Sequence, residues 1–262
     1  MLKRRLIPVL FLQNGVMVRS ERFSIHQAIG HPIIHVQRLV QWNIDELIVL
    51  DITEGEESYD FRRDDTRLGG AKNLLEFINN VAVDCNIPLT FGGRIRSFED
   101  IHVRIQNGAD KVTLNSVVAE NPKLITDAAH AFGSQAVVVS IDYRMVDGSP
   151  RVYTHHASRD VGCDAITWAE RAEELGAGEI FLSAVDRDGT AQGYDMETIQ
   201  KVVEAVEITV IGCGGAGHQS HFLKCLAETG ASAVAAGNIF HFTENAYPRA
   251  KAYLRERRDD MR

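Results

Sequence analysis

The 262-residue sequence predicts an α/β protein that folds as a single (β/α)8 TIM barrel over residues 1–262. Eight short apolar runs, typical of buried parallel strands, alternate with longer segments in which apolar residues recur at helical spacing. An internal repeat also divides the chain into two halves of four strand–helix units each. A closed (β/α)8 barrel requires eight strand–helix units, whereas an open sheet does not require that number.

Strands are expected at the apolar runs, and helices where apolar residues recur three and four positions apart. The predicted strands are Leu6–Leu12, Leu47–Ile52, Pro88–Phe91, Lys111–Leu114, Ala136–Ile141, Ile180–Ser183, Ile208–Ile211 and Ala233–Ala236. The predicted helices are Ile33–Trp42, Ala71–Val83, Phe98–Gln106, Pro122–Phe132, Ala165–Leu175, Met196–Val206 and His218–Thr229. Strict alternation makes the strands parallel, with the helices as crossover connections.

The internal repeat favours the closed barrel over an open sheet. The glycine pair Gly92-Gly93 and the later segment Asn107–Asp110 recur as Gly214-Gly215 and Thr229–Ser232. A single glycine pair after a strand is often only a turn, but two pairs in register weaken that interpretation. The two half-barrels are therefore expected at about residues 1–134 and 135–262.

Composition and charge exclude several classes of protein. The chain is 45% hydrophobic and has a formal net charge of −8 without a cluster of Lys and Arg residues, so nucleic acid is not expected as a partner. No apolar run approaches the roughly 18 residues of a membrane helix. The four cysteines are scattered, and the ten histidines lack metal-ligand spacing. We expect a soluble, cytoplasmic protein with no membrane contact, no metal and no cofactor.

One predicted connection is abnormally long. The segment Ile52–Gly70 places 19 residues between the second strand and its helix, against the roughly 2–6 residues of a typical strand-to-helix loop. It is rich in acidic and basic residues, which usually indicates solvated surface. Strand-to-helix loops also build the catalytic face of a barrel, so a functional role for residues 52–70 is the alternative.

Candidate ligand residues follow the carboxyl ends of the strands, where barrel enzymes place their chemistry. Glycines there let backbone N–H groups approach an anion closely. The candidates are Asp51, Gly93, Arg94, Asn115 and Ser116 in the first half, and Ser183, Asp188, Gly189, Gly214, Gly215, Ala236 and Gly237 in the second. Glycine loops in both halves predict two phosphate sites across the mouth, and hence a ligand with a phosphate at each end. Asp142, after the fifth strand, is the candidate general acid or base; the alternative is an aspartate that caps the next element.

Long, ordered motifs over essentially the whole chain resemble the cyclase subunit of imidazole glycerol phosphate synthase. They are Ile7-Pro8, Asp45–Leu47, Gly108–Val112, Phe132–Gln135, Gly176–Ile180, Asp186–Thr190, Gly193–Asp195, Gly214–Gly217 and Phe240–Phe242. The resemblance implies a duplicated half-barrel that pairs with a class I glutaminase. Ammonia from the glutaminase would cross the barrel to a bisphosphate substrate, which the cyclase converts to imidazole glycerol phosphate and an aminoimidazole carboxamide ribonucleotide.

The sequence departs from this family at the substrate mouth. The family uses two aspartates as general acid and base; Asp142 matches the second, but Phe11 occupies the position of the first. Losing one such partner costs roughly 10²–10⁴ in rate. Arg19 replaces a substrate-binding lysine and is followed by Ser20 in place of glycine, and Arg94 replaces the third glycine of a phosphate loop. Gly237 replaces a serine, and the segment 52–70 is longer than the family's loop.

The opposite end of the barrel retains the family pattern. Arg5, Glu46, Lys111 and Glu179 match four charged residues that form a salt-bridged ammonia gate in the family. The alternative is an ordinary buried ion-pair layer that stabilises the barrel, although burying four charges is costly. Asp110 and Gln135 match positions near the glutaminase contact.

The pattern resembles a divergent branch that serves amidation of N-acetylated sugars in bacterial surface polysaccharide synthesis. The segments Met1–Leu10, Val18–Ser20, Arg62–Asp65 and Phe91–Arg96 carry this resemblance. It implies an ammonia-conducting subunit that pairs with a glutaminase and supplies a separate sugar amidotransferase. Two alternatives remain: an active cyclase of histidine biosynthesis in which Asp51 or another carboxylate replaces the missing acid, and a phosphate-binding scaffold that conducts nothing.

Overall fold

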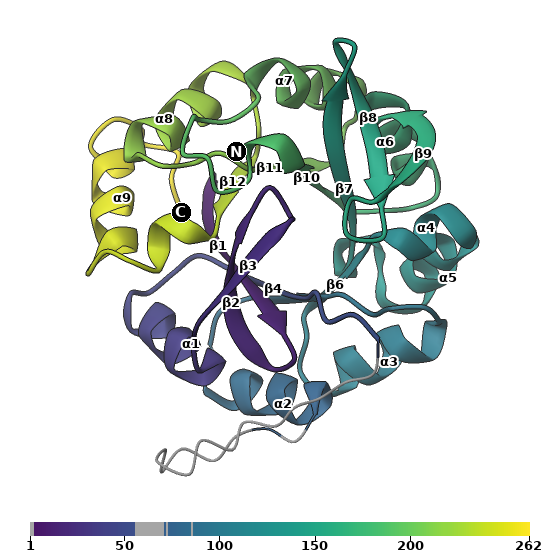
Figure 1. The fold of residues 1–262 in the computed structure, drawn as a ribbon, viewed down its shortest axis with the longest axis horizontal. Coiled ribbons are helices and arrows are strands. Elements are labelled where there is room, and N and C mark those ends of the chain that lie inside the picture. The colour runs from purple at the N-terminus through teal and green to yellow at the C-terminus, as the bar shows by residue number, and fades with distance from the viewer. Residues whose placement is uncertain (1–2, 56–70, 72, 85) are drawn as a thin grey trace.

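The computed structural model describes the chain except for residues 1–2, 56–70, 72 and 85, so most of the long predicted loop lies outside the described residues. Eight parallel strands form a closed barrel because the fifth pairs with the sixth and the eighth pairs with the first, which confirms the predicted fold class (Figure 1). In chain order they are β1 (Arg5–Gln13), β4 (Leu47–Asp51), β5 (Leu89–Gly92), β6 (Lys111–Leu114), β7 (Val137–Val146), β10 (Glu179–Ala184), β11 (Thr209–Cys213) and β12 (Ala233–Ala236).

Helices surround the barrel and join consecutive strands (Figure 1). They are α1 (Pro32–Gln41), α2 (Leu74–Asp84), α3 (Phe98–Gln106), α4 (Ser116–Glu120), α5 (Lys123–Phe132), α6 (Ala165–Glu174), α7 (Met196–Ala205), α8 (Gln219–Glu228) and α9 (Ala246–Arg255). Neither α4 nor α9 was predicted from the sequence. The former is too short to show a period, and the latter has a polar, charge-rich sequence that weakens the apolar signal.

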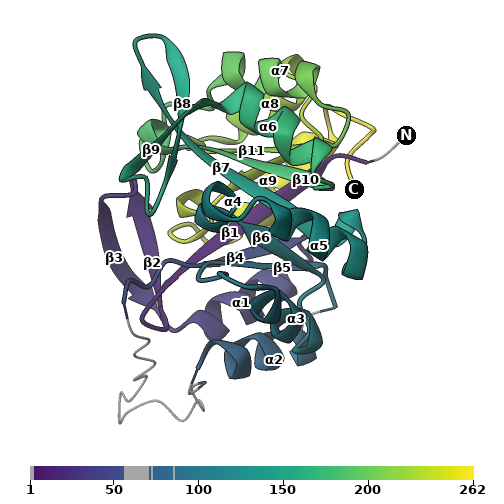
Figure 2. The ribbon, with the colours of Figure 1, turned by 90° about the vertical axis from the view of Figure 1, so that its right-hand side faces the viewer.

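Two antiparallel hairpins, also absent from the sequence prediction, extend the barrel strands. One comprises β2 (Val16–Glu21) and β3 (Ile25–Gly30) after β1; the other comprises β8 (Ser149–Thr154) and β9 (Arg159–Asp164) after β7. Figure 2 shows both at the carboxyl ends of the strands, opposite the two chain termini. The turns that lead into them, Asn14-Gly15 between β1 and β2 and Asp147-Gly148 between β7 and β8, have positive φ, and such dipeptides are the strongest short-range hairpin signal.

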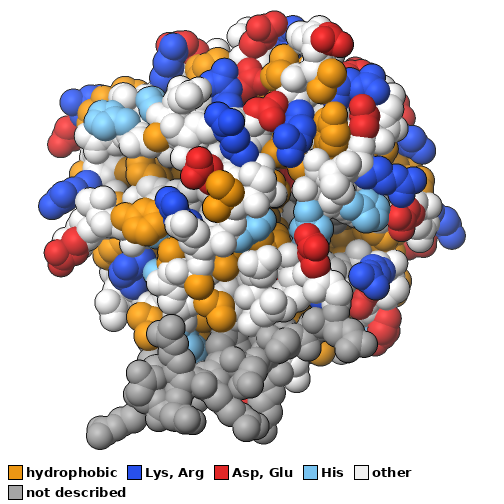
Figure 3. Space-filling model, in the orientation of Figure 1, with side chains coloured by type: hydrophobic (Ala, Val, Ile, Leu, Met, Phe, Trp, Pro, Cys, Tyr) orange, Lys and Arg blue, Asp and Glu red, His pale blue; other side chains and the backbone are white. Residues whose placement is uncertain are grey.

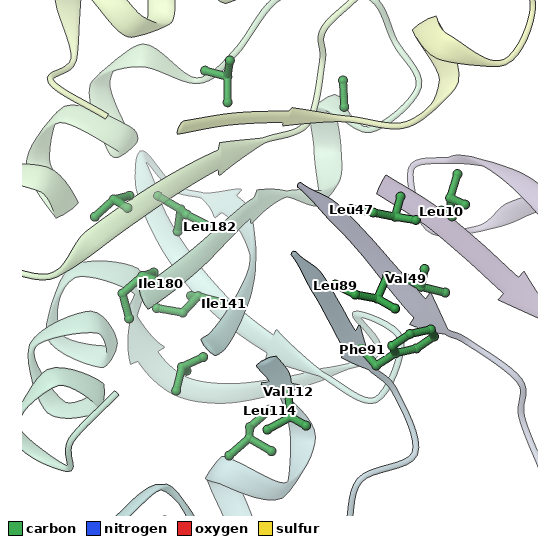
Figure 4. Close-up of a cluster of buried hydrophobic side chains, with 14 of the residues drawn as sticks. Leu10, Leu47, Val49, Leu89, Phe91, Val112, Leu114, Ile141, Ile180 and Leu182 are labelled. Carbon is green, nitrogen blue, oxygen red and sulfur yellow. The ribbon is translucent and has the colours of Figure 1, made fainter. Parts of the chain in front are cut away.

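The core has two layers because alternate residues of each strand face opposite sides. Side chains pointing outward, among them Leu10, Val49 and Phe91, pack between the barrel and the helices (Figure 4). A second buried cluster fills the barrel itself and includes Ile7, Val9, Phe11, Ile48, Val138, Phe181, Ile211 and Cys213. Phe11 is therefore an interior residue at the carboxyl end of β1.

Three short 3-10 helices complete the described fold: Ser134–Ala136, Val185–Arg187 and Asn238–Phe240. Among the described residues, no helix combines the length and the apolar character needed to cross a bilayer.

Candidate active site

A cavity of about 530 Å³ opens at the carboxyl ends of β1 and β4 to β7. Figure 3 views this face, on which histidine side chains gather near the middle. Of the residues predicted from the sequence, the cavity is lined by Phe11, Asp51, Gly93, Arg94, Asn115, Ser116 and Asp142. The structure thus brings together the first-half candidates and the candidate acid or base.

Asp142 lies at the mouth end of the barrel portion of β7 and is only 8% exposed. Its carboxylate accepts hydrogen bonds from the Asn115 side-chain amide at 2.8 Å and from the Ser140 hydroxyl at 3.5 Å. Burial raises the pKa of Asp142 to about 7, although these two hydrogen bonds partly oppose the shift. A carboxyl group with such a pKa can both donate and accept a proton near neutral pH.

Phe11 brings a hydrocarbon ring to the mouth of the barrel. It is 5% exposed and packs edge-to-face against Phe23, with 5.7 Å between the ring centroids. Phe23 belongs to the turn between β2 and β3, so Phe11 contacts the hairpin that crosses the mouth. A phenyl ring exchanges no proton, which leaves Asp142 and Asp51 as the predicted carboxylates that line the cavity.

The β2–β3 hairpin is fastened to the β10 side of the mouth. The Ser20 hydroxyl donates a 2.6 Å hydrogen bond to the Asp188 carboxylate, and the Phe23 backbone N–H donates to the same oxygen at 3.3 Å. The Asn238 side-chain amide also donates to the Ser20 carbonyl at 2.7 Å. Gly189 packs so closely that a Cβ there would lie 2.6 Å from the Ser20 carbonyl oxygen.

The remaining second-half candidates do not line the cavity. Gly214 and Gly215 are buried, and a Cβ on either would collide with the backbone of Ala184 or Gly193. Ser183 and Ala236 are also buried, whereas Gly237 is half-buried beside the Phe11 ring. Close backbone packing explains why glycine is needed at 214 and 215.

Gly93 and Arg94 shape the β5 side of the mouth. Both have positive φ, 90° and 55° respectively, and Gly93 packs directly on the Asp51 backbone. The Arg94 guanidinium donates to the Gly55 carbonyl at 2.8 Å and to the Thr53 carbonyl at 3.3 Å. Arg94 therefore ties the β5 loop to the described beginning of the segment 52–70.

Arg19 does not line the cavity. Its Nε donates a 2.6 Å hydrogen bond to Gln27 on the neighbouring strand of the hairpin. Its guanidinium lies 5.9 Å from the centroid of the Phe242 ring. In this structure Arg19 therefore braces the hairpin from outside.

His155 and His156 line the cavity, although neither was predicted from the sequence as a site residue. They and Ala157 have φ values between 52° and 58°, a conformation that costs free energy in non-glycine residues and concentrates at functional sites. The His155 backbone N–H donates to the Ser116 hydroxyl at 2.9 Å. Only the adjacent pair of histidines could have signalled the site in the sequence.

At the opposite end of the barrel, the four predicted gate residues form a closed ring of ion pairs. Arg5 contacts Glu46 at 2.5 Å and Glu179 at 3.0 Å, and Lys111 contacts both carboxylates at 2.9 Å. Burial alone would raise the pKa of Glu46, but Arg5 and Lys111 outweigh it and lower that pKa. Burial would likewise lower the pKa of Arg5, yet Glu46 and Glu179 raise it. Arg5 and Glu46 are therefore held in their charged forms.

Asp110 and Gln135, predicted to lie near a partner, are exposed residues just before β6 and β7. Asp110 accepts a 2.8 Å hydrogen bond from the Leu89 backbone, and Gln135 donates to the Phe132 carbonyl at 3.3 Å. At the same end, Lys251 of α9 forms a buried ion pair with Asp45 that the sequence analysis missed. Within the described part of the chain, no group of His, Cys, Asp and Glu side chains is arranged to hold a metal ion.

Comparison with known proteins gives a family. Residues 5–246 match the model of the family described as histidine biosynthesis protein. The chain is 41% identical to the imidazole glycerol phosphate synthase subunit HisF of Metallosphaera sedula, over 98% of this chain and 97% of the relative. It is 40% identical to that of Sulfurisphaera tokodaii and 39% identical to that of Alkaliphilus metalliredigens, each over 100% of both chains. The chain therefore belongs to the histidine biosynthesis protein family, among the HisF-like cyclase subunits of imidazole glycerol phosphate synthase.

Proposed function

We propose that this chain is the ammonia-conducting barrel subunit of a glutamine amidotransferase complex and has little cyclase activity of its own. The observation that carries the proposal is the contrast between the two ends of one barrel. The ring of Arg5, Glu46, Lys111 and Glu179 is complete at one end, whereas Phe11 replaces a proton-transfer group at the other. A class I glutaminase would dock at the ring end, near Asp110 and Gln135, in the cytoplasm.

Hydroxyl groups inside the barrel support a route for ammonia. The Thr90 hydroxyl donates to Glu46 of the ring at 3.3 Å, and the Ser140 hydroxyl donates to Asp142 at the mouth. Between them on β6, the Thr113 hydroxyl is buried, has no hydrogen-bond partner among the described residues, and faces the cavity. Polar groups on three neighbouring strands could thus accept hydrogen bonds from ammonia in succession.

The acceptor of the ammonia would be a separate amidotransferase that acts on an N-acetylated sugar in surface polysaccharide synthesis. Phe11 supports this proposal because the family's own cyclisation requires two proton-transfer groups. Ser20 and Arg94, which resemble the divergent branch, both have structural roles at the mouth. Ser20 holds the hairpin through its bond to Asp188, and Arg94 binds the Gly55 carbonyl in the segment 52–55. The family's phosphorylated substrate would then no longer be the acceptor.

A second candidate function is the cyclase reaction of histidine biosynthesis. It is favoured by the relatives, which are named as HisF subunits at 39–41% identity, and by the pKa of Asp142, which burial raises to about 7. Asp51, which is 3% exposed and lines the cavity, would supply the second carboxylate. A third candidate, a non-conducting phosphate-binding scaffold, would leave the hydroxyl route without a role.

A cyclase assay separates the first two candidates. The purified chain and its Phe11→Asp variant are given the formimino bisphosphate substrate and an ammonium salt, and imidazole glycerol phosphate is measured. We expect turnover by the unmodified chain to be about 10²–10⁴-fold below that of an active cyclase, with a gain in the Phe11→Asp variant. Robust turnover by the unmodified chain would overturn the proposal.

Conduction is tested with the glutaminase partner. We expect the barrel to stimulate glutamine hydrolysis or to couple it to sugar amidation, and we expect Arg5→Ala to weaken coupled transfer while reactions with free ammonia are spared. Glu244→Ala serves as the control, because Glu244 is exposed and lies far from the four ring residues in the sequence. If neither hydrolysis nor amidation responds to the barrel, the scaffold candidate replaces the channel.

A further inference from the structure

Two departures from the family pattern fasten the same hairpin. Phe11 packs edge-to-face on Phe23, and the Ser20 hydroxyl donates to Asp188 at 2.6 Å. Ser20 is only 1% exposed, so its hydrogen bond is shielded from water. A glycine at position 20 would lack this bond, and an aspartate at position 11 would place a carboxylate against the Phe23 ring. Phe11 and Ser20 therefore act together as a latch for the β2–β3 hairpin.

The latched hairpin divides the mouth into two unequal parts. On the β10 to β12 side it lies on Asp188, Gly189 and Asn238, which include two of the residues predicted for a second phosphate site. Gly214 and Gly215 on that side pack against neighbouring backbone, and neither lines the cavity. On the β4 to β7 side the cavity is open, with Phe23 of the hairpin as part of its wall.

The open part carries the groups that suit one phosphate. Arg94, Arg96, His155, His156 and Ser116 are among the residues that line it. Guanidinium groups bind phosphate oxygens through charge-assisted hydrogen bonds. Hydroxyl, amide and carboxyl groups of other lining residues, including Asn115 and Asp142, suit a polyhydroxylated remainder.

We infer that the mouth binds a ligand with a single phosphate, such as a sugar monophosphate, and that the Phe11–Ser20 latch closes the second phosphate subsite. The phosphate lies by Arg96 and Ser116, and the polar remainder points toward Asp142. A cavity of about 530 Å³ accommodates a ligand of this size. This inference rests on the proposed function, because it places the ligand where ammonia leaves the barrel.

The test measures binding by isothermal titration calorimetry with the full chain and no glutaminase. Ribose 5-phosphate and ribulose 1,5-bisphosphate are the probes, and inorganic phosphate gives the number of phosphate sites. We expect the two sugar phosphates to bind with dissociation constants within about threefold of each other, and we expect one inorganic phosphate to bind per chain. Both sugar phosphates should bind to Arg96→Ala at least about tenfold more weakly. Arg96 is exposed, so its removal spares the fold.

The latch is tested by a Ser20→Gly and Phe23→Ala double variant. We expect it to bind the bisphosphate at least about tenfold more tightly than the monophosphate, because the second subsite opens. Ser24→Ala is the matched control, since Ser24 lies in the same hairpin and its hydroxyl donates to the Glu21 carbonyl, at 3.2 Å. A similar tenfold preference in the unmodified chain, no gain in the double variant, or no phosphate binding at all would overturn the inference. Loss of ammonia transfer with phosphate binding intact would instead count against the proposed function alone.

Discussion

The side-chain amide of Asn115 donates a 2.8 Å hydrogen bond to Oδ2 of Asp142. Asn115 follows β6 and Asp142 lies on the neighbouring β7, so the barrel itself sets this contact. The bond stabilises the charged carboxylate, whereas burial disfavours it. Asn115 therefore moderates how strongly burial raises the pKa of Asp142.

Replacing Asn115 with alanine should raise the pKa of Asp142 beyond its present value of about 7. The expected further rise is about one to two pH units, because a charge-assisted hydrogen bond to the ionised form is lost. Titration of the Asp142 carboxyl carbon by NMR measures the shift. Asn121→Ala, at the exposed end of α4, is the control; an unchanged or lower pKa in Asn115→Ala would show that the bond does not stabilise the charged form.

Asp142→Asn should stabilise the protein at pH 8 but not at pH 3. The folded state keeps the Asp142 proton up to about pH 7, whereas an unfolded aspartate releases it near about pH 4. The folded state thus binds more protons between these values, and the wild type loses stability as the pH rises through that window. We expect a gain of between about 1 and 4 kcal/mol at pH 8.

Urea unfolding at the two pH values measures this gain. Asp147→Asn is a suitable control because Asp147 is exposed in the turn between β7 and β8. Equal differences between Asp142→Asn and the wild type at pH 3 and pH 8 would contradict the linkage to Asp142.

Glu46→Ala should be strongly destabilising. Glu46 is 1% exposed and contacts both Arg5 and Lys111, so its removal leaves two partly buried cations with Glu179 as their one carboxylate partner among the described residues. Breaking a buried ion pair in this way costs about 3–5 kcal/mol. Denaturant unfolding checks the value against exposed Glu244→Ala. A loss below about 1 kcal/mol would mean that water, rather than Glu46, compensates the two cations.

Local sequence signals predicted the barrel well because each strand and helix shows its own period. The helix predicted at Phe98–Gln106 has those bounds in the structure, where Ser97 and Asp100 form a capping box. The four charged residues at the base were grouped in advance through the family resemblance, and in the structure each begins or precedes a strand. The duplication into half-barrels stays a prediction, as do the roles of the site residues.

The structure of the mouth was not predictable in the same way. The contact between Phe11 and Phe23 and the bond between Ser20 and Asp188 join residues whose partners depend on where the hairpin lies. No local period encodes that placement, although the Asn14-Gly15 turn signals that the chain turns back after β1 into β2. His155 likewise enters the cavity through an unusual backbone conformation, which composition does not reveal.

Gly93→Ala should destabilise the fold far more than Gly148→Ala. Both glycines have positive φ, 90° and 79°, so both substitutions carry a conformational cost of about 1 kcal/mol. At Gly93, however, the new Cβ would lie 1.9 Å from the Asp51 carbonyl oxygen, whereas no described atom lies within 4 Å of a Cβ at Gly148. The collision forces β4 and β5 apart at the mouth, and we expect a total loss above about 3 kcal/mol at Gly93. Urea midpoints of the two variants measure the difference, and equal losses would mean that backbone conformation alone, rather than the contact with Asp51, requires glycine at position 93.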